Sequence, residues 1–288
     1  MRWGKARESD NVEDARRGGV PVGRLSLGGI AIVVVVGLLS GQNPMQILDQ
    51  LIGQSAVTTS SQQGAQPQAV PAANDPEMRF VRSILGDTED TWQALFSQAG
   101  KQYRDPTLVV FRGGVNSACG FATAAVGPFY CPADQRVYLD LQFFQDMATR
   151  FSAAGDFAQA YVIAHEVGHH VQTLIGIPGS MERARQGGAS MEGATGLLVR
   201  QELQADCLAG VWAFHGQQRH NWLEEGDVEE ALNAANAIGD DRLQHQAQGH
   251  VVPDAFTHGS SAQRVRWFST GFKSGDPDSC DTFAAQRL

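Results

Sequence analysis

The sequence predicts an α+β fold, a mostly helical domain with a small β-sheet, preceded by one transmembrane helix. Three observations predict it: apolar residues recur at helical spacing through most of the C-terminal half, two short central runs are rich in β-branched or aromatic residues, and one uncharged apolar stretch lies near the N-terminus. The chain has 288 residues, of which 42% are hydrophobic and 18% charged, so it can bury a real core.

The apolar stretch near the N-terminus, LSLGGIAIVVVVGLLSG at 25–41, has 17 residues without a charge, at the lower end of what crosses a bilayer as a helix. Six basic residues precede it, against four acidic ones. The positive-inside rule therefore predicts that segment 1–24 stays in the cytoplasm and that the rest is periplasmic or extracellular. A cleaved signal peptide is the alternative, but the long basic segment and the lack of a clear A-x-A site favour an uncleaved anchor in the cytoplasmic membrane.

The remaining elements follow in chain order. Residues 42–76 are rich in Gln, Ser, Ala and Pro, which predicts a flexible linker before a domain at 77–288. Asp75 is placed to cap a helix, and Gly86 with Asp87 after it predicts the start of a second one. Strands are predicted at 107–111 (TLVVF) and 136–141 (RVYLDL), and further helices at 142–151, 156–175, around 193–216, 227–238 and 260–272.

Charge and cysteine content narrow the class of protein. The formal net charge of -9 and the lack of a basic cluster after residue 24 exclude a general nucleic-acid surface, so no nucleic-acid partner is expected. Four cysteines in an exported domain are expected to pair, and they allow three connectivities. The Gly- and Pro-bearing segment between Cys119 and Cys131 favours a local bridge there, which leaves Cys207 with Cys280. No C-x-x-C spacing supports a zinc cluster instead.

The segment AYVIAHEVGHHVQTLIG at 160–176 places an HExxH pattern in a run that is otherwise typical of a buried helix. Successive helical residues turn by about 100°, so His165 and His169 project from one face and can share one metal ion. Glu166 does not bind the metal in this arrangement; it faces a metal-activated water and can accept its proton. The spacing predicts two ligands and a general base for one Zn²⁺ per chain.

A catalytic zinc site needs a third protein ligand, and Glu202 is the candidate. It lies in LLVRQELQADCLAGVWAF at 197–214, where Asp206 follows one helical turn later on the same face. One carboxylate can then bind the metal while the other orients a ligating histidine through its second ring nitrogen. A structural ion pair with Arg200 is the alternative, and the two motif histidines favour the metal.

Three other residues compete for the position of third ligand. Glu182 and Glu192 lie in a segment of Gly, Ser and Arg that is typical of a loop, which would order a ligand poorly. His170 lies about 100° around the helix from the second motif histidine and is predicted to be a packed or hydrogen-bonded histidine. The metzincin extension is excluded because Gln172 and Ile175 occupy the positions that require Gly and His.

Four separated motifs occur in order: SACGFATAAVGPFYCPADQRVYLDLQFF at 117–144, HEVGHH at 165–170, RQELQADCLAGVW at 200–212 and THGSSAQRVRWFSTGF at 257–272. Together they resemble the bacterial putative neutral zinc metallopeptidase family, as does NVEDARR before the apolar segment. Four motifs in order are far more specific than HExxH alone. The resemblance implies a zincin-like fold and a gluzincin-like site, HExxH plus ExxxD, with His165, His169 and Glu202 as ligands, Glu166 as general base and Asp206 behind them.

These residues predict a membrane-anchored zinc-dependent peptidase that hydrolyses a peptide or protein substrate with a zinc-activated water and Glu166 as the general base. A further donor for the oxyanion is expected. His258 in the turn THGSS is the candidate, with Tyr138 and Tyr161 behind it, and a surface or helix-cap histidine is the alternative. Resemblance to gluzincins implies that the strand RVYLDL binds an extended peptide along its edge.

The alternative function is a non-catalytic or latent zinc-binding envelope protein that engages a membrane or cell-wall partner. Glu166 favours the enzyme, because a structural zinc site has no use for a carboxylate beside the water position and more often closes with a fourth Cys or His. Hydrolysis of a cell-wall peptide amide would use the same chemistry.

Overall fold

The computed structural model describes residues 1–16, 75–123, 126–150 and 153–288. The strands are β1 (Val12–Asp14), β2 (Thr107–Phe111), β3 (Gly114–Ser117), β4 (Gly120–Thr123), β5 (Phe129–Cys131) and β6 (Arg136–Asp140). The α-helices are α3 (Pro76–Gln98), α4 (Gln142–Arg150), α5 (Asp156–Ile175), α6 (Ile177–Gln186), α7 (Leu197–His220), α8 (Asp227–Ala237), α9 (Asp240–Gln248) and α10 (Ser261–Ser274), joined by the short 3₁₀ helices η1 (Trp3–Lys5), η4 (Pro253–Ala255) and η5 (Pro277–Cys280).

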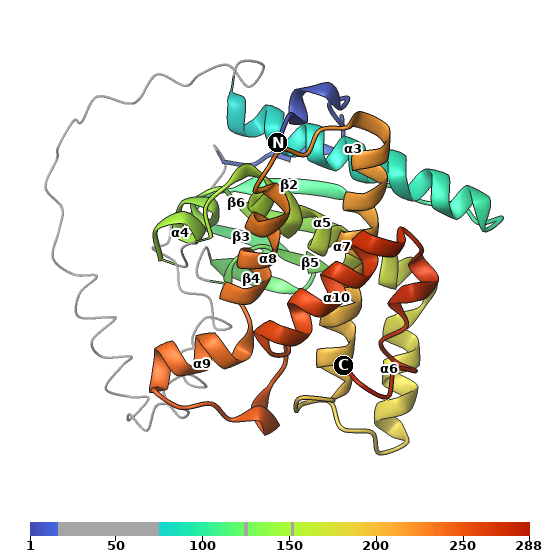
Figure 1. Cartoon of the computed structure of the whole chain (residues 1–288), viewed down its shortest axis with the longest axis vertical. Coiled ribbons are helices and arrows are strands. Elements are labelled where there is room, and N and C mark those ends of the chain that lie inside the picture. Colours follow the sequence, from blue (N-terminus) through green and yellow to red (C-terminus); the bar gives the residue numbers. More distant parts are fainter. Residues whose placement is uncertain (17–74, 124–125, 151–152) are drawn as a thin grey trace, which may run out of the picture.

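A four-stranded mixed sheet in the order β1-β2-β6-β5 carries the helices (Figure 1). The first three strands are parallel, and β5 is antiparallel to β6. Side chains alternate between the two faces of a strand. Along β2, Leu108 and Val110 therefore join the main core, while Val109 and Phe111 join a second, smaller cluster on the other face.

The predicted strands at 107–111 and 136–141 form β2 and β6, but the expected role of the second as an edge strand is wrong. β6 lies between β2 and β5, because residues 136–138 pair with both neighbours. Among the described residues, β5 ends the sheet. A short strand of three residues leaves little periodic pattern in the sequence, which is why β5 was not predicted.

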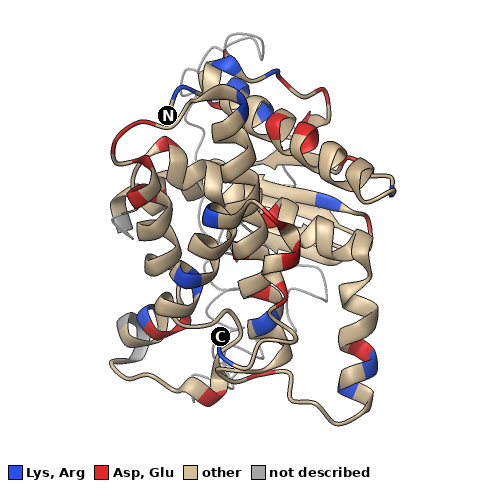
Figure 2. Cartoon of the chain, turned by 45° about the vertical axis from the view of Figure 1, so that its right-hand side comes forward, with Lys and Arg blue, Asp and Glu red and all other residues tan. Residues whose placement is uncertain are grey.

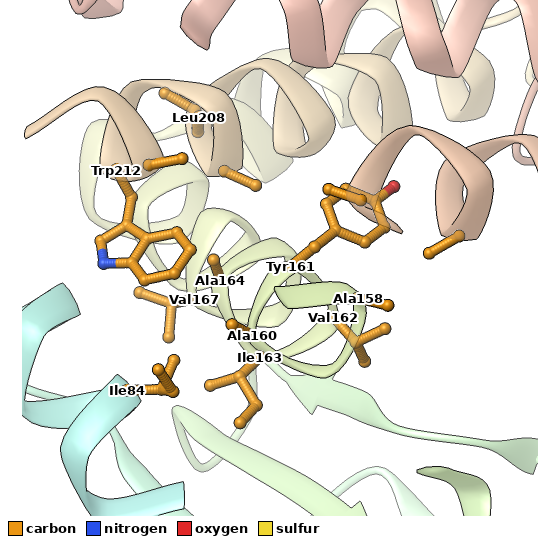
Figure 3. Packing of buried hydrophobic residues seen from close by; sticks show 14 of the residues in the cluster. Ile84, Ala158, Ala160, Tyr161, Val162, Ile163, Ala164, Val167, Leu208 and Trp212 are labelled. Atoms are coloured by element: carbon orange, nitrogen blue, oxygen red, sulfur yellow. The ribbon is translucent and has the colours of Figure 1, made fainter. Parts of the chain in front are cut away.

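Helix α5 is the centre of the packing (Figure 3). Val167 and Ile163 of α5 belong to the same buried cluster as Ile84 of α3 and Trp212 and Leu208 of α7. The close-up shows α7 on one side of α5 and the sheet on the other. Burial on all sides accounts for the nearly continuous apolar pattern of this helix.

The N-terminal helix of the domain, α3, is one helix and not the predicted two. Asp75 caps it by accepting hydrogen bonds from the N–H groups of Glu77 and Met78, as its sequence suggested. The helix then continues through Gly86, whose role is in packing and not in breaking the helix. A Cβ at this position would lie 2.5 Å from the carbonyl oxygen of Arg7, so the glycine lets the N-terminal segment cross the helix.

That N-terminal segment, residues 1–16, is part of the folded domain. Strand β1 pairs in parallel with β2, with Val12 opposite Leu108. On α3, the buried carboxylate of Glu89 accepts hydrogen bonds from Ser9 Oγ at 2.7 Å and Asn11 Nδ2 at 2.8 Å. The Glu89 carboxylate therefore ties the first residues of the chain to α3.

The expected transmembrane helix and the single-pass topology are corrected by these findings. None of the helices in the described part of the chain is long and apolar enough to span a membrane, and the predicted span at 25–41 lies outside the described residues, as does most of the predicted linker. Because β1 and β2 pair in one sheet, residues 1–16 and the helical domain cannot lie on opposite sides of a bilayer. The described fold is a mixed α/β domain.

Charged residues of both signs are interspersed over the helices in the view of Figure 2. Two disulfides tie loops to this framework: Cys119 with Cys131, and Cys207 with Cys280. This is the pairing that the cysteine spacing favoured. The first joins the β3–β4 turn to β5, and the second joins α7 to the C-terminal segment.

The backbones of α7 and α10 lie in close contact at a glycine of α10. A larger residue at this position should therefore strongly lower the stability of the fold. A Cβ on Gly271 would overlap the carbonyl oxygen of Cys207. We expect Gly271→Ala to lower the free energy of unfolding by about 2 kcal/mol or more, since two packed backbones must separate. Urea denaturation followed by circular dichroism measures this change.

The matched control is Gly179→Ala in α6, where a Cβ would come no closer than 3.6 Å to Arg183 Nη1. That variant should be neutral or up to about 1 kcal/mol more stable, because alanine favours helix. Equal stability of the Gly271 variant and the wild type would contradict close backbone packing of α7 on α10.

Candidate metal centre

Helix α5 holds the HExxH pattern in the interior of the domain. His165 and Glu166 are buried and His169 is half-buried. Between the two histidines, Gly168 allows α7 to approach, because a Cβ there would lie 3.0 Å from the carbonyl oxygen of Ala205. This close approach places the carboxylates of α7 opposite the two imidazoles.

The histidines and Glu202 form one cluster of donor atoms. His165 Nε2 lies 3.2 Å from His169 Nε2 and 3.2 Å from Glu202 Oε2, and His169 Nε2 lies 3.5 Å from Glu202 Oε1. One ligand atom from each residue lies within 4.8 Å of the others. Tetrahedral zinc, with bonds of about 2.0–2.1 Å, requires neighbouring donors about 3.3–3.4 Å apart. The spacing and the N/N/O donor set both fit this geometry.

Asp206 lies behind the cluster and contacts the far side of one imidazole. Its Oδ1 lies 2.8 Å from His165 Nδ1 and accepts a hydrogen bond from Tyr161 Oη at 2.5 Å. Because a carboxylate is an acceptor, Nδ1 carries a proton, and Nε2 is the ring nitrogen that faces the cluster and can bind a metal. The predicted position of Asp206 behind the ligands agrees with this arrangement.

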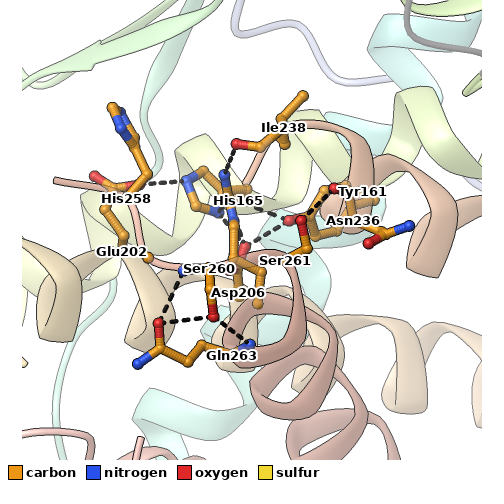
Figure 4. A network of polar contacts seen from close by, with 12 residues as sticks. Tyr161, His165, Glu202, Asp206, Asn236, Ile238, His258, Ser260, Ser261 and Gln263 are labelled. Carbon is orange, nitrogen blue, oxygen red and sulfur yellow. Dashed lines mark hydrogen bonds and ion pairs between the residues drawn. The ribbon is translucent and has the colours of Figure 1, made fainter. Parts of the chain in front are cut away.

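Asp206 lies beside His165 and Tyr161 in Figure 4. The cation that balances it is Arg264 of α10, which the sequence did not single out. Its Nε donates to Asp206 Oδ2 at 2.9 Å and its Nη2 to Oδ1 at 2.9 Å, a bidentate pair in which both side chains are buried. Arg200, the partner in the alternative interpretation, instead donates to backbone carbonyls of the C-terminal segment, including Thr282 and Ala285. The sequence indicates that a buried carboxylate such as Asp206 needs a cation nearby. The spacing of residues along the chain does not show which arginine supplies it.

This network sets the charge of the site. Burial alone would raise the pKa of Asp206, but the charge of Arg264 and the contact with His165 outweigh it and lower this pKa to about 2. Burial likewise opposes the charged form of Glu202, and the two histidines outweigh it and hold its pKa well below the usual value. The pKa of His165, lowered by burial, is raised more strongly by Asp206 and reaches about 10. The carboxylates are therefore ionised, and a metal ion must displace a proton from His165 to bind.

The competing candidates for the third ligand lie elsewhere. Glu182, on α6, pairs with Arg185 on the surface. Glu192 is not part of the cluster of His165, His169 and Glu202. His170 points away from the cluster, with Nδ1 3.1 Å from Tyr130 Oη and Nε2 2.6 Å from the carbonyl oxygen of Arg104.

A cavity of about 610 Å³ opens in front of the cluster. Its lining includes the three donor residues and Glu166, together with Phe129 and Tyr130 of β5, Phe143 of α4, Leu243 of α9 and His258. The two sides of the cavity thus differ: ionisable groups meet at the α5–α7 face, and aromatic and aliphatic side chains form much of the remainder. Such a mixture is typical of a ligand-binding pocket.

The candidates for oxyanion donor occupy different places. His258 lines the cavity, and its Nδ1 lies 3.2 Å from Asp240 Oδ1, so that Nδ1 is the ring nitrogen in contact with this carboxylate. Asp240 Oδ2 also accepts the N–H groups of His258 and its two neighbours, so the turn is held rigidly. Tyr161 commits its hydroxyl to Asp206, and Tyr138 donates to Asp134 and is absent from the cavity lining.

A His–His–Glu donor set presented by an HExxH helix and a neighbouring helix defines the class of HExxH metalloproteins. Comparison with known proteins identifies the family within that class. The family model described as "Putative neutral zinc metallopeptidase" matches residues 1–283, and the chain belongs to this family.

Two relatives illustrate the family. The chain is 50% identical to the protein YpfJ of Escherichia coli K12, over 98% of this chain and 99% of the relative. It is 46% identical to the protein Rv2575 of Mycobacterium tuberculosis, over 73% of each chain. No solved structure matches the chain.

Proposed function

We propose that this protein is a zinc-dependent peptidase that hydrolyses peptide bonds in the cavity between α5 and the edge of the sheet. The observation that carries the proposal is the cluster of His165, His169 and Glu202, with Glu166 beside it and the cavity in front of it. A structural zinc site would more often have a fourth ligand from Cys or His. Among the described residues, the cluster consists of His165, His169 and Glu202.

The donor set fits zinc in number, type and spacing, and His165, His169 and Glu202 would hold the ion. When bound, zinc supplies Lewis acidity, which polarises a carbonyl group and lowers the pKa of water. Glu166 follows His165 on α5 and faces the same cavity. Its carboxylate accepts the proton of the attacking water and later passes that proton to the leaving amine.

His258 supplies the further donor. Its hydrogen bond to Asp240 raises its pKa, which favours the imidazolium form, in which both ring nitrogens are donors. Nδ1 is held by Asp240, and Nε2 donates to the oxygen that becomes negatively charged as the carbonyl is attacked. The rigid turn around His258 supports this role, because an oxyanion donor acts best when it is already in place.

Strand β5 binds the substrate backbone. It ends the sheet among the described residues, and both Phe129 and Tyr130 line the cavity. An extended peptide added to this edge gains backbone hydrogen bonds with little demand on its own side chains. The apolar lining favours a substrate with an aliphatic or aromatic side chain next to the cleaved bond.

Metal content and cleavage of an unfolded protein test the proposal. We expect about one zinc per chain in the wild type and a large loss of zinc in Glu202→Ala, because one of three ligands is removed. The matched control is Glu182→Ala, which removes a surface carboxylate that pairs with Arg185 and Gln186 of its own helix, α6. Both proteins are purified without chelator, and zinc is measured by atomic absorption.

Three outcomes bear on the assignment. Full zinc in Glu182→Ala with loss in Glu202→Ala supports the ligand set. Full zinc in both variants would exclude Glu202 as a ligand. Stoichiometric zinc with no cleavage of several unfolded substrates by the wild type would favour the zinc-binding scaffold over the peptidase.

A further inference from the structure

We propose that a relay of two buried amide side chains, Gln172 and Gln204, orients His169 for the metal and connects it to the C-terminal disulfide. The inference rests on the proposed metal centre. It gives His169 a counterpart to the carboxylate behind His165, and the motif spacing does not reveal it, since glutamine is not a residue expected in an HExxH site.

The first step of the relay joins Gln172 to His169. Gln172 lies on α5, three residues after His169, and its side chain is fully buried. His169 Nδ1 lies 2.9 Å from Gln172 Oε1. A carbonyl oxygen only accepts, so Nδ1 carries the proton and Nε2 is left with the lone pair that faces the cluster.

The orientation of the Gln172 amide is determined by its other end. Nε2 donates to the backbone carbonyl of Gln201 at 2.7 Å, and a carbonyl cannot act as donor. The amide therefore cannot rotate by 180° without placing two acceptors against each other. Because Gln201 precedes the ligand Glu202, this bond also holds the HExxH helix against the helix that carries the third ligand.

The second step continues to Gln204 and the C-terminal segment. Gln172 Nε2 also donates to Gln204 Oε1 at 3.1 Å, and Gln204 Nε2 donates to the carbonyl oxygen of Cys280 at 3.1 Å. Gln204 is 7% exposed. Cys280 is bonded to Cys207 of α7, so the final acceptor is held covalently to the same helix as Gln204.

The two histidines are thus oriented by partners of different charge. His165 faces Asp206, an ionised group paired with Arg264, whereas His169 faces a neutral amide. An amide orients the ring without adding a negative charge to a site that already has Glu166, Glu202 and Asp206. Loss of such an orienting partner typically lowers metal affinity by about 10- to 100-fold.

The test measures Zn²⁺ affinity of the full chain by competition with a chromophoric chelator, and the visible absorption of the Co²⁺-loaded protein. We expect Gln172→Leu to bind Zn²⁺ about 10- to 100-fold more weakly and to change the Co²⁺ spectrum. Gln204→Leu, one step further from the ring, should fall between the wild type and Gln172→Leu.

The matched control is Gln93→Leu, which removes an exposed amide bonded to Asp105 far from the site in sequence and should bind Zn²⁺ like the wild type. Unchanged affinity and an unchanged Co²⁺ spectrum in Gln172→Leu would overturn the relay. If Gln172→Leu does not fold, unchanged affinity in Gln204→Leu overturns it instead. A wild type that binds neither metal would overturn the proposed metal centre, and the relay with it.

Discussion

Glu166→Gln is expected to lose peptidase activity by about a thousandfold while it keeps its zinc. A general base contributes about 10²- to 10⁴-fold, and glutamine has nearly the same shape but cannot accept the proton of water. Glu166 is not part of the cluster of His165, His169 and Glu202, so the zinc content of the variant should equal that of the wild type. The measurement is the rate of cleavage of an unfolded protein, with zinc determined on the same samples.

The control for this variant is Glu229→Gln, which makes the same chemical change on the exposed side of α8. Its rate should equal that of the wild type. A Glu166 variant that retained more than a tenth of the activity would show that another group accepts the proton. Loss of zinc from the same variant would move Glu166 from the role of base to that of ligand.

Arg264→Met is expected to lower the free energy of unfolding at pH 7 by about 3–5 kcal/mol. The substitution keeps side-chain length but leaves Asp206 ionised and buried without its bidentate partner. Removal of one member of a buried ion pair costs about this much, because the remaining charge is uncompensated. Urea denaturation measures the loss. Arg266→Met, two residues later on the exposed side of α10, should cost less than about 1 kcal/mol.

The Asp206–Arg264 ion pair also predicts how the free energy of unfolding depends on pH. The pKa of Asp206 is about 2 in the folded protein, below its ordinary value of 3.8. A depressed pKa adds stability that is present above the ordinary pKa and disappears as pH falls toward the folded value. The wild type should therefore lose this contribution between about pH 4 and pH 2, and the variant, which lacks the main partner, should not. A stability difference that stayed constant over this range would show that Arg264 acts through packing and not through the charge of Asp206.

The spacing of residues in the sequence predicts the part of the site that lies within single helices. Residues four apart on a helix share a face whatever the rest of the fold does, so HExxH and ExxxD predicted which side chains could meet. Their order along an apolar run also predicted that α5 and α7 are buried. The strands β2 and β6 were found for the same reason, since β-branched alternation is a property of a short segment.

The errors came from segments whose environment is distant in sequence. The sequence predicts a break between helices at Gly86, but the lack of a side chain there makes room for residues 7–9. The first 16 residues were interpreted as a cytoplasmic tail, although three of them complete the sheet beside β2. A strand of three residues has no periodicity to detect, and its pairing with a strand more than ninety positions away is a tertiary contact.

The residues of this sequence therefore specified the proposed ligand atoms and the proposed base, because helical spacing is a local property of the chain. Two sets of partners give those atoms their direction and charge: Arg264, which pairs with Asp206 behind His165, and the Gln172–Gln204 pair behind His169. They come from the packing of α5, α7, α10 and the C-terminal segment. Buried polar groups must find hydrogen-bond partners, but which partner is within 3 Å depends on the fold as a whole and not on the distance along the chain.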